Sequence, residues 1–164
     1  MLDRDISNYA SLFPKEYTEL RVQENRSNGV ALLNGDVVNN GKSSTSGVSA
    51  RIFKDGHWGF ASNPNISDSA VESVIRSSTD NVRFMNKRDD SRCGIMLPDT
   101  YFSFEKDFTT SKQKNSQKHW IDFLKELDDY IANKYPKITS RTVVVRELDM
   151  EKSLLTATGS TSYS

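Results

Sequence analysis

The chain has 164 residues, of which 35% are hydrophobic and 27% charged, and this is enough for one domain or one and a half. Its 22 basic residues balance 22 acidic ones, so the formal net charge at pH 7 is zero and gives no electrostatic reason to expect binding to nucleic acid or an anionic membrane. A single cysteine, Cys93, excludes an intrachain disulfide, and without a signal peptide or a membrane-length apolar run we expect a cytoplasmic protein.

The first half of the chain predicts a helix followed by an antiparallel meander. Apolar residues at helical spacing predict a short helix near Asp3 to Phe13, which Pro14 ends. From Tyr17 the period changes to two and predicts a strand. The pairs Asn34-Gly35 and Asp55-Gly56 tolerate positive φ, which two-residue hairpin turns require. We therefore expect four strands, over about 17–33, from 37 onward, over 48–53 and over 58–61. Within the first, residues 30–33 either continue the strand or restart it after an irregularity at Asn28-Gly29.

The second half predicts helices and two further strands. One amphipathic helix is expected from Ser67 or Asp68 to near Phe84, and a second over 116–134. Strands are expected at 142–145 and 154–158. This order indicates an α+β fold in which helices cover an antiparallel sheet. We expect an N-terminal α+β domain over 1–85, an irregular linker over 86–111, and the start of a further segment over 112–164.

No set of residues predicts an active site. His57 and His119 are far apart in sequence and lack metal-ligand spacing, so we expect a turn or packing role for His57 and a solvated helix position for His119. Cys93 has no neighbouring histidine and is expected to be a lone loop thiol or a partly buried one. The carboxylates Glu126, Asp128 and Asp129 are expected on the polar face of the second helix. We therefore assign no catalytic, cofactor-binding or metal-binding residue.

Glycines in the meander are expected to permit particular backbone conformations and close packing. They do not form a phosphate-binding loop, because none lies between a strand and a helix in the required pattern. Gly47 and Gly59 are expected to permit a bulge or a close approach of another segment.

The block from Tyr17 to Phe84 resembles the N-terminal domain of the TldD/PmbA family, whose members are often called modulators of DNA gyrase. The resemblance is strongest in the order and spacing of two stretches, 46–51 (Ser-Gly-Val-Ser-Ala-Arg) and 56–62 (Gly-His-Trp-Gly-Phe-Ala-Ser). The opening strand at 17–21 and the hairpin at 33–37 also match, whereas the helix over 116–134 matches only in order and pattern.

This resemblance implies a function for a longer parent protein. Family members are zinc metallopeptidases that act on peptides and unfolded segments, or metal-free subunits that pair with them. The metal-binding motif lies in the C-terminal half of the family's chains, so no catalytic residue can be transferred to this sequence. We expect a domain that forms a wall of the substrate chamber and part of a subunit interface, with a homologous subunit and a peptide as partners, in a chain that is truncated or split.

Two alternatives stay open. The parent can be a metal-free partner subunit, or the chain can be a stand-alone interaction module without catalytic activity. Trp58 and Phe60 are candidates for contact with a partner or a peptide, but we favour a place in the core for both, because most tryptophans and phenylalanines are largely buried.

Overall fold

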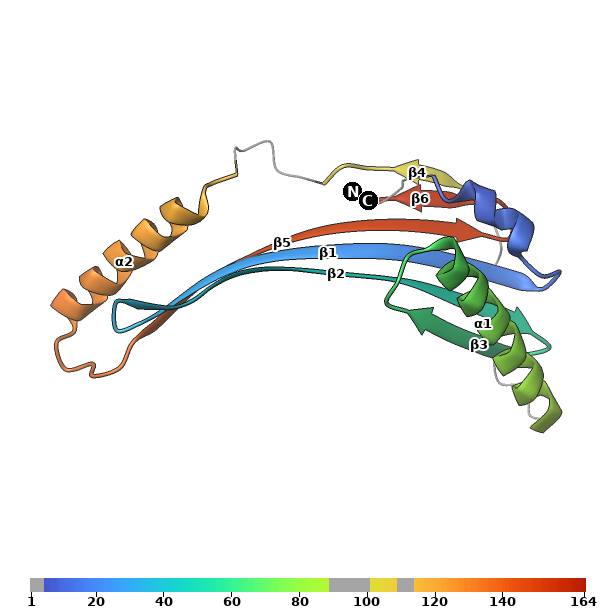
Figure 1. The fold of residues 1–164 in the computed structure, drawn as a ribbon, viewed down its shortest axis with the longest axis horizontal. Coiled ribbons are helices and arrows are strands. Elements are labelled where there is room, and N and C mark those ends of the chain that lie inside the picture. Colours follow the sequence, from blue (N-terminus) through green and yellow to red (C-terminus); the bar gives the residue numbers. More distant parts are fainter. Residues whose placement is uncertain (1–4, 89–100, 109–113) are drawn as a thin grey trace. The chain divides into compact units, whose positions relative to one another are not determined.

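The computed structural model describes residues 5–88, 101–108 and 114–164. It is an α+β fold built on a six-stranded sheet with the strand order β3-β2-β1-β5-β6-β4, drawn in Figure 1. Cys93 lies outside the described residues, as do parts of the expected linker. In chain order the elements are η1 (Ser7–Leu12), β1 (Tyr17–Leu33), β2 (Asp36–Lys54), β3 (His57–Asn63), α1 (Asp68–Arg88), β4 (Ser103–Glu105), α2 (Gln117–Lys134), β5 (Thr142–Thr156) and β6 (Thr161–Tyr163).

Both predicted hairpin turns are present. Asn34 and Asp55 have φ of 50° and 49°, and the glycine that follows each has φ of 87°. Two successive positive φ values are the signature of the type I′ turn, whose twist matches that of the strands it joins. The first turn joins β1 to β2, and the second joins β2 to β3 in antiparallel register, with Lys54 opposite His57 and Val48 opposite Asn63.

The strand count differs from the expected one. The two strands predicted after the first turn are a single strand, β2, so the meander has three strands. Likewise, the strands expected at 142–145 and 154–158 are parts of β5, which ends at Thr156. Two short strands were not predicted: β6 pairs antiparallel with β5 and parallel with β4. The initial helix is a single 3₁₀ segment, η1.

The chain divides into two compact units, and the long strands contribute to both. Unit 1 comprises Met1–Glu24, Thr45–Phe108 and Met150–Ser164, and unit 2 comprises Asn25–Ser44 and Thr109–Asp149. The expected domain boundaries near residues 85 and 111 stay a prediction. No helix in the described ranges is both long and apolar enough to cross a membrane.

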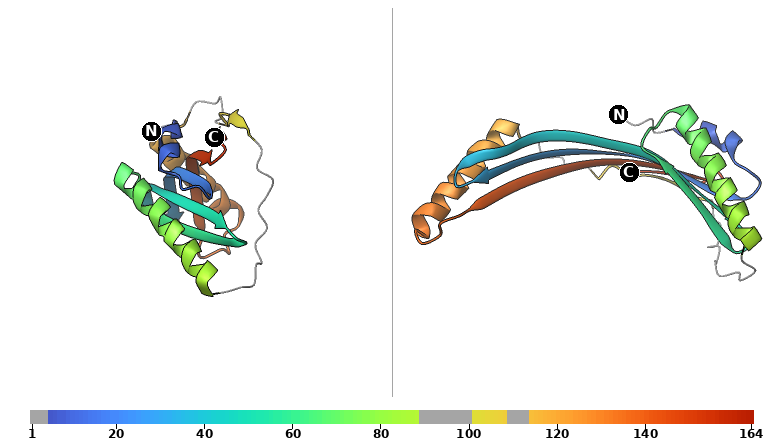
Figure 2. Two further views of the ribbon diagram at one scale, coloured as in Figure 1. Left: turned by 90° about the vertical axis from the view of Figure 1, so that its right-hand side faces the viewer. Right: turned by 60° about the horizontal axis from the view of Figure 1, so that its bottom comes forward.

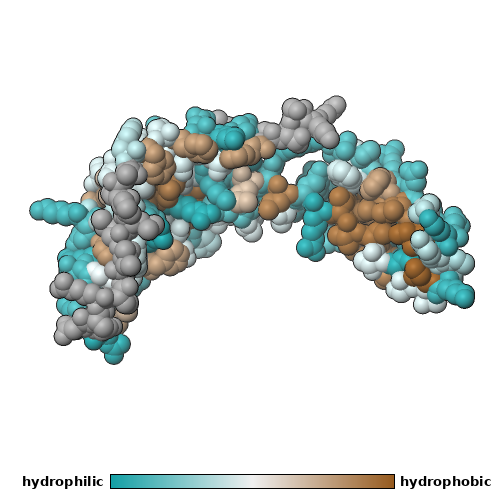
Figure 3. Space-filling view, turned by 180° about the vertical axis from the view of Figure 1, so that it is seen from behind, coloured by the Kyte–Doolittle hydropathy of each residue, from teal (hydrophilic) through white to brown (hydrophobic). Residues whose placement is uncertain are grey.

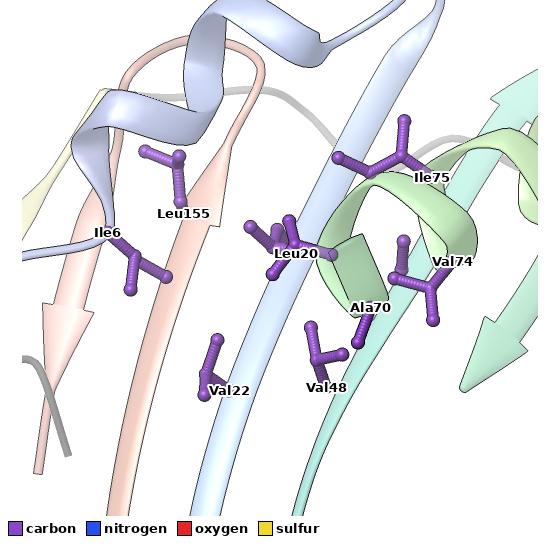
Figure 4. Close-up of a cluster of buried hydrophobic side chains, with 10 residues drawn as sticks. Ile6, Leu20, Val22, Val48, Ala70, Val74, Ile75 and Leu155 are labelled. Carbon is purple, nitrogen blue, oxygen red and sulfur yellow. The ribbon is translucent and has the colours of Figure 1, made fainter. Parts of the chain in front are cut away.

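The core of unit 1 lies between the sheet and α1. Alternate residues of β1 and β2, among them Leu20, Val22 and Val48, meet the apolar face of α1, and Ile6 and Leu155 extend the cluster (Figure 4). Ser67 begins the helix, since its carbonyl accepts the Ala70 and Val71 N–H groups. The helix packs against β3, and the two elements lie side by side in each view of Figure 2.

Unit 2 has a smaller core. Only Val30, Leu32, Leu124 and Val143 form its buried cluster, with Trp120, Ile121, Ile131 and Val145 packed against it. The helix α2 begins at Gln117, and the Ser116 hydroxyl caps it by accepting the His119 N–H at 3.1 Å.

Candidate functional site

Gly59 marks the closest approach of β3 to α1. A Cβ atom at this position would lie 2.1 Å from the Ser78 carbonyl oxygen and 2.7 Å from the Val82 nitrogen, so any side chain would meet the helix backbone. The predicted close approach is therefore confirmed at this glycine. Because strand residues alternate between faces, the position of Gly59 directs the side chains of Trp58 and Phe60 to the sheet face away from α1.

That second face of the unit 1 sheet carries a cluster of aromatic and charged side chains, which we call the Trp58 cluster. It consists of Tyr17, Glu19, Arg51, Phe53 and Trp58. The Trp58 ring contacts Tyr17 edge-on at 6.0 Å and Phe53 at 5.0 Å between centroids, and the Arg51 guanidinium lies 4.8 Å from its centroid. The expected core position is wrong for Phe60, which is 59% exposed, whereas Trp58 is half-buried among these contacts.

Ion pairs hold the Trp58 cluster in place. Arg51 Nη2 donates to Glu19 Oε1 at 2.9 Å, Arg51 Nε also bonds Glu19, and the Tyr17 hydroxyl donates to the same carboxylate at 2.8 Å. Donation of these hydrogen bonds to Glu19 raises the pKa of Arg51 above its ordinary value. With both of its oxygens engaged, Glu19 is a structural acceptor and is not available as a general base.

A second charged contact lies at the end of β2. Lys54 Nζ donates to Glu16 Oε1 at 2.8 Å, and this hydrogen bond lowers the pKa of Glu16 below its ordinary value. Such pairing is typical of a structural ion pair at a partly exposed site.

The carboxylates of α2 do not behave alike. Glu126 and Asp129 are exposed, as expected for the polar face, but Asp128 is 1% exposed and the expectation is wrong there. Arg141 Nε and Nη2 each donate to one oxygen of Asp128 at 3.0 Å. This fork-to-fork geometry is the strong form of the arginine–carboxylate pair, and it raises the pKa of Arg141.

The Asp128–Arg141 pair also reaches the first hairpin turn. The backbone N–H of Asn34 donates to the Arg141 carbonyl at 2.9 Å, and the Arg141 N–H donates to Asn34 Oδ1 at 2.8 Å. Nearby in the same unit, Glu147 accepts from Trp120 Nε1 at 3.0 Å and from Asn28 Nδ2 at 2.9 Å. These carboxylates are satisfied acceptors that tie α2 to β1 and β5, and none has a free oxygen aimed at a cleft.

The histidines are not brought together. His57 is 7% exposed at the start of β3, and its two ring nitrogens have no hydrogen-bond partner in the described part of the chain, which fits a packing role. His119 is exposed on α2, in unit 2, with its ring 5.3 Å from that of Trp120. Across residues 5–88, 101–108 and 114–164, no three His, Cys, Asp or Glu side chains form a group able to hold a metal ion. The described residues therefore do not fit a zinc site.

Exposed apolar side chains gather in unit 2. Figure 3 shows hydrophobic residues at the end of the molecule that carries α2. The exposed apolar residues of this unit include Val37, Val38, Phe123, Leu127, Tyr130, Val144 and Leu148. A concentration of this kind is typical of a surface that another protein segment covers.

Comparison with known proteins points to one family. Residues 18–82, which run from β1 into α1, match the family model for PmbA/TldA metallopeptidase domain 1. No curated protein matches the sequence of the chain.

Solved structures share the fold. A Bacteroides thetaiotaomicron protein described as a candidate modulator of DNA gyrase superposes with a TM-score of 0.72 at 14% identity, over 96% of this chain and 36% of that one. TldE from Thermococcus kodakarensis gives 0.69 at 14% identity, over 97% and 35%. A candidate gyrase modulator from Thermotoga maritima gives 0.62 at 17% identity, over 90% and 33%. The chain thus spans about a third of the length of each of these structures.

Proposed function

Because residues 18–82 place this chain in the PmbA/TldD metallopeptidase family as its first domain, we propose that it is the N-terminal, non-catalytic domain of a cytoplasmic zinc metallopeptidase that cleaves peptides or unfolded segments. The family match is the observation that carries the proposal. It covers the β1–β2–β3 meander and most of α1, which form one compact core in unit 1.

The proposal assigns zinc to a part of the parent protein outside these residues. His57 and His119 belong to different units and no described cluster fits the metal, so we assign the described residues no step in the hydrolysis itself. Bound elsewhere in the parent, zinc would polarise the scissile carbonyl and activate water.

Within the parent, we assign this domain to the wall of the substrate chamber and to a subunit contact. The Trp58 cluster and the exposed Phe60 support the assignment to the chamber wall, because aromatic and arginine side chains on a firm sheet face are the residue types enriched at interfaces. The partners would be a homologous subunit and a peptide substrate, without nucleic acid or membrane.

The alternative is a metal-free partner subunit or a stand-alone interaction module. The observation that favours it is the similarity in fold to TldE. The two proposals differ in whether the parent has a His-Glu-x-x-x-His helix.

The test begins with the residues that the native gene encodes after Ser164. We would purify the full-length product, measure its zinc by mass spectrometry, and assay cleavage of an unfolded peptide with and without a chelator. A zinc-binding motif, stoichiometric zinc and chelator-sensitive cleavage are expected. The 164-residue chain is the matched control and is expected to bind no zinc. A full-length protein without motif, zinc and activity would overturn the peptidase proposal in favour of the alternative.

A further inference from the structure

One side of α1 carries a row of alternating charges, which we call the α1 charge row. It consists of Glu72, Arg76, Asp80 and Arg83, all of them exposed. Spacings of three and four residues place these side chains on the same side of the helix. In the described part of the chain, neither Arg76 nor Asp80 has an ion-pair partner, although they are one helical turn apart and of opposite sign. Arg83 interacts electrostatically with Glu16.

A groove of about 250 Å³ runs beside this row. Leu12 and Pro14, which lie at and just after the end of η1, face Ile75 and Thr79 of α1 across it, and the four charged residues complete its lining. Its lining therefore combines apolar side chains with both signs of charge. All of these residues belong to unit 1.

The signs of the charge row restrict the kind of partner. Two acids and two bases cancel, so a polyanion would meet Glu72 and Asp80, and a strongly basic segment would meet Arg76 and Arg83. Like charges brought together at an interface disfavour association. A fitting partner must present the opposite alternation.

The same helix in a second copy presents that alternation when it runs antiparallel. Around a two-fold axis near residue 78, Glu72 faces the second copy's Arg83 and Arg76 faces its Asp80, and symmetry repeats both pairs. The outer pairs extend the pattern, because Asp68 near the start of α1 falls opposite Lys87 near its end.

Helix-dipole preference does not account for the whole row. Acids in the first turn and bases in the last turn of a helix stabilise it in isolation, which explains Asp68 and Lys87. It does not explain the central Arg76 and Asp80, where the base comes first. A base four residues before an acid is also the weaker order for pairing within one helix.

We propose that the α1 charge row and its groove form a self-association surface, on which α1 of a second copy packs antiparallel. This inference rests on the proposed function, since it assigns the expected subunit contact to one face of the chain. It concerns no zinc and no peptide, so its test is separate from the peptidase assay.

The test exploits the symmetry of the central pairs. Arg76→Asp makes the centre of the row entirely acidic, and Asp80→Arg makes it entirely basic. Each variant alone faces like charges in a symmetric dimer, whereas a mixture of the two restores opposite charges. We would measure the mass of the 164-residue chain by sedimentation equilibrium over a range of concentrations, with Lys125→Asp on α2 as a charge-reversal control.

The expected result is a dimer for the native chain and for Lys125→Asp. Each single variant should dimerise with a Kd at least ~10-fold higher, and the mixture of the two should form a heterodimer close to native affinity. The double variant Arg76→Asp/Asp80→Arg should dimerise again, and added salt should weaken every dimer.

Three outcomes would overturn the proposal: a native chain that stays monomeric, single variants that dimerise as the native chain does, or a mixture that fails to associate while each component is folded by circular dichroism. None of these outcomes would contradict the peptidase proposal, because a full-length protein can bind zinc and cleave peptides as a monomer or as a dimer formed through another interface. Loss of zinc and activity in the full-length protein would, conversely, leave the mass measurements unchanged.

Discussion

Substituting Gly59 by alanine tests the packing of α1 on β3. The φ of Gly59 is not positive, so alanine can adopt its backbone conformation, and on chain entropy alone the change would stabilise the fold by about 0.4–1 kcal/mol. The new Cβ, however, would lie 2.1 Å from the Ser78 carbonyl and 2.8 Å from Val82 Cβ, where ordinary contact begins at 3.4 Å. The nearest obstacles are backbone atoms, so no rotamer change relieves them.

The helix must therefore retreat from the sheet by about 1 Å or more, which forfeits a large part of each dispersion contact across the interface. Val71 and Val82 are fully buried there, and Val74 nearly so. Overpacking of a core costs ~1–3 kcal/mol in general. Since the obstruction is the rigid backbone, we expect a loss at or above the upper end of that range, a large share of a typical domain's stability.

Urea unfolding followed by far-UV circular dichroism measures this loss as a lower midpoint. The matched control is Gly29→Ala, also in a strand, where a Cβ would meet Val145 O at 3.6 Å and Arg146 Cγ at 3.8 Å, both ordinary contacts. We expect that variant to unfold at the native midpoint or slightly above it. If Gly59→Ala matched Gly29→Ala, the inferred closeness of α1 and β3 would be wrong.

Three further predictions concern polar contacts and local stability. Arg141→Gln leaves Asp128 buried without its cation and should lower the urea midpoint, whereas Lys125→Gln on the exposed side of α2 should not; equal midpoints would refute the structural role of the pair. The lowered pKa of Glu16 means that the unfolded chain takes up the proton first, so stability from this group should fall as pH drops below about 4.5. The stability of Glu16→Gln should therefore fall less on acidification than the stability of Glu126→Gln does. Identical profiles of stability against pH for the two variants would contradict this prediction. Amide hydrogen exchange should be faster in α2 than in α1, because the unit 2 core is smaller, and slower exchange in α2 would refute the comparison.

Local chemistry made the hairpin turns and the alternation of β3 predictable. Asn34-Gly35 and Asp55-Gly56 favour the type I′ turn, and both pairs have its positive φ values in the structure. The length of β2 was not predictable in this way. Its middle, from Asn39 to Ser46, is polar and has low strand propensity, and it is extended because β1 is its neighbour in the sheet.

The candidate site shows the same limit. The alternation of side chains along a strand predicts that Trp58 and Phe60 share one face of β3. It does not predict which face α1 covers. Gly59 was the available signal, since a glycine within a strand often marks the approach of another backbone. For Asp128 no such signal existed, because its partner Arg141 lies beyond the end of α2 and is brought close only by the turn into β5.

Polar contacts have different weight in the two units. In unit 1, ten buried hydrophobic residues form the core, and the Trp58 cluster adds contacts on a face that already has a packed layer behind it. In unit 2 only four residues form the buried cluster, so the Asp128–Arg141 pair and the Glu147 contacts must define how α2 meets β1 and β5. A unit built in this way has little apolar burial of its own, and it exposes Phe123, Leu127 and Tyr130 on α2. Covering those side chains would add apolar burial that the unit lacks by itself.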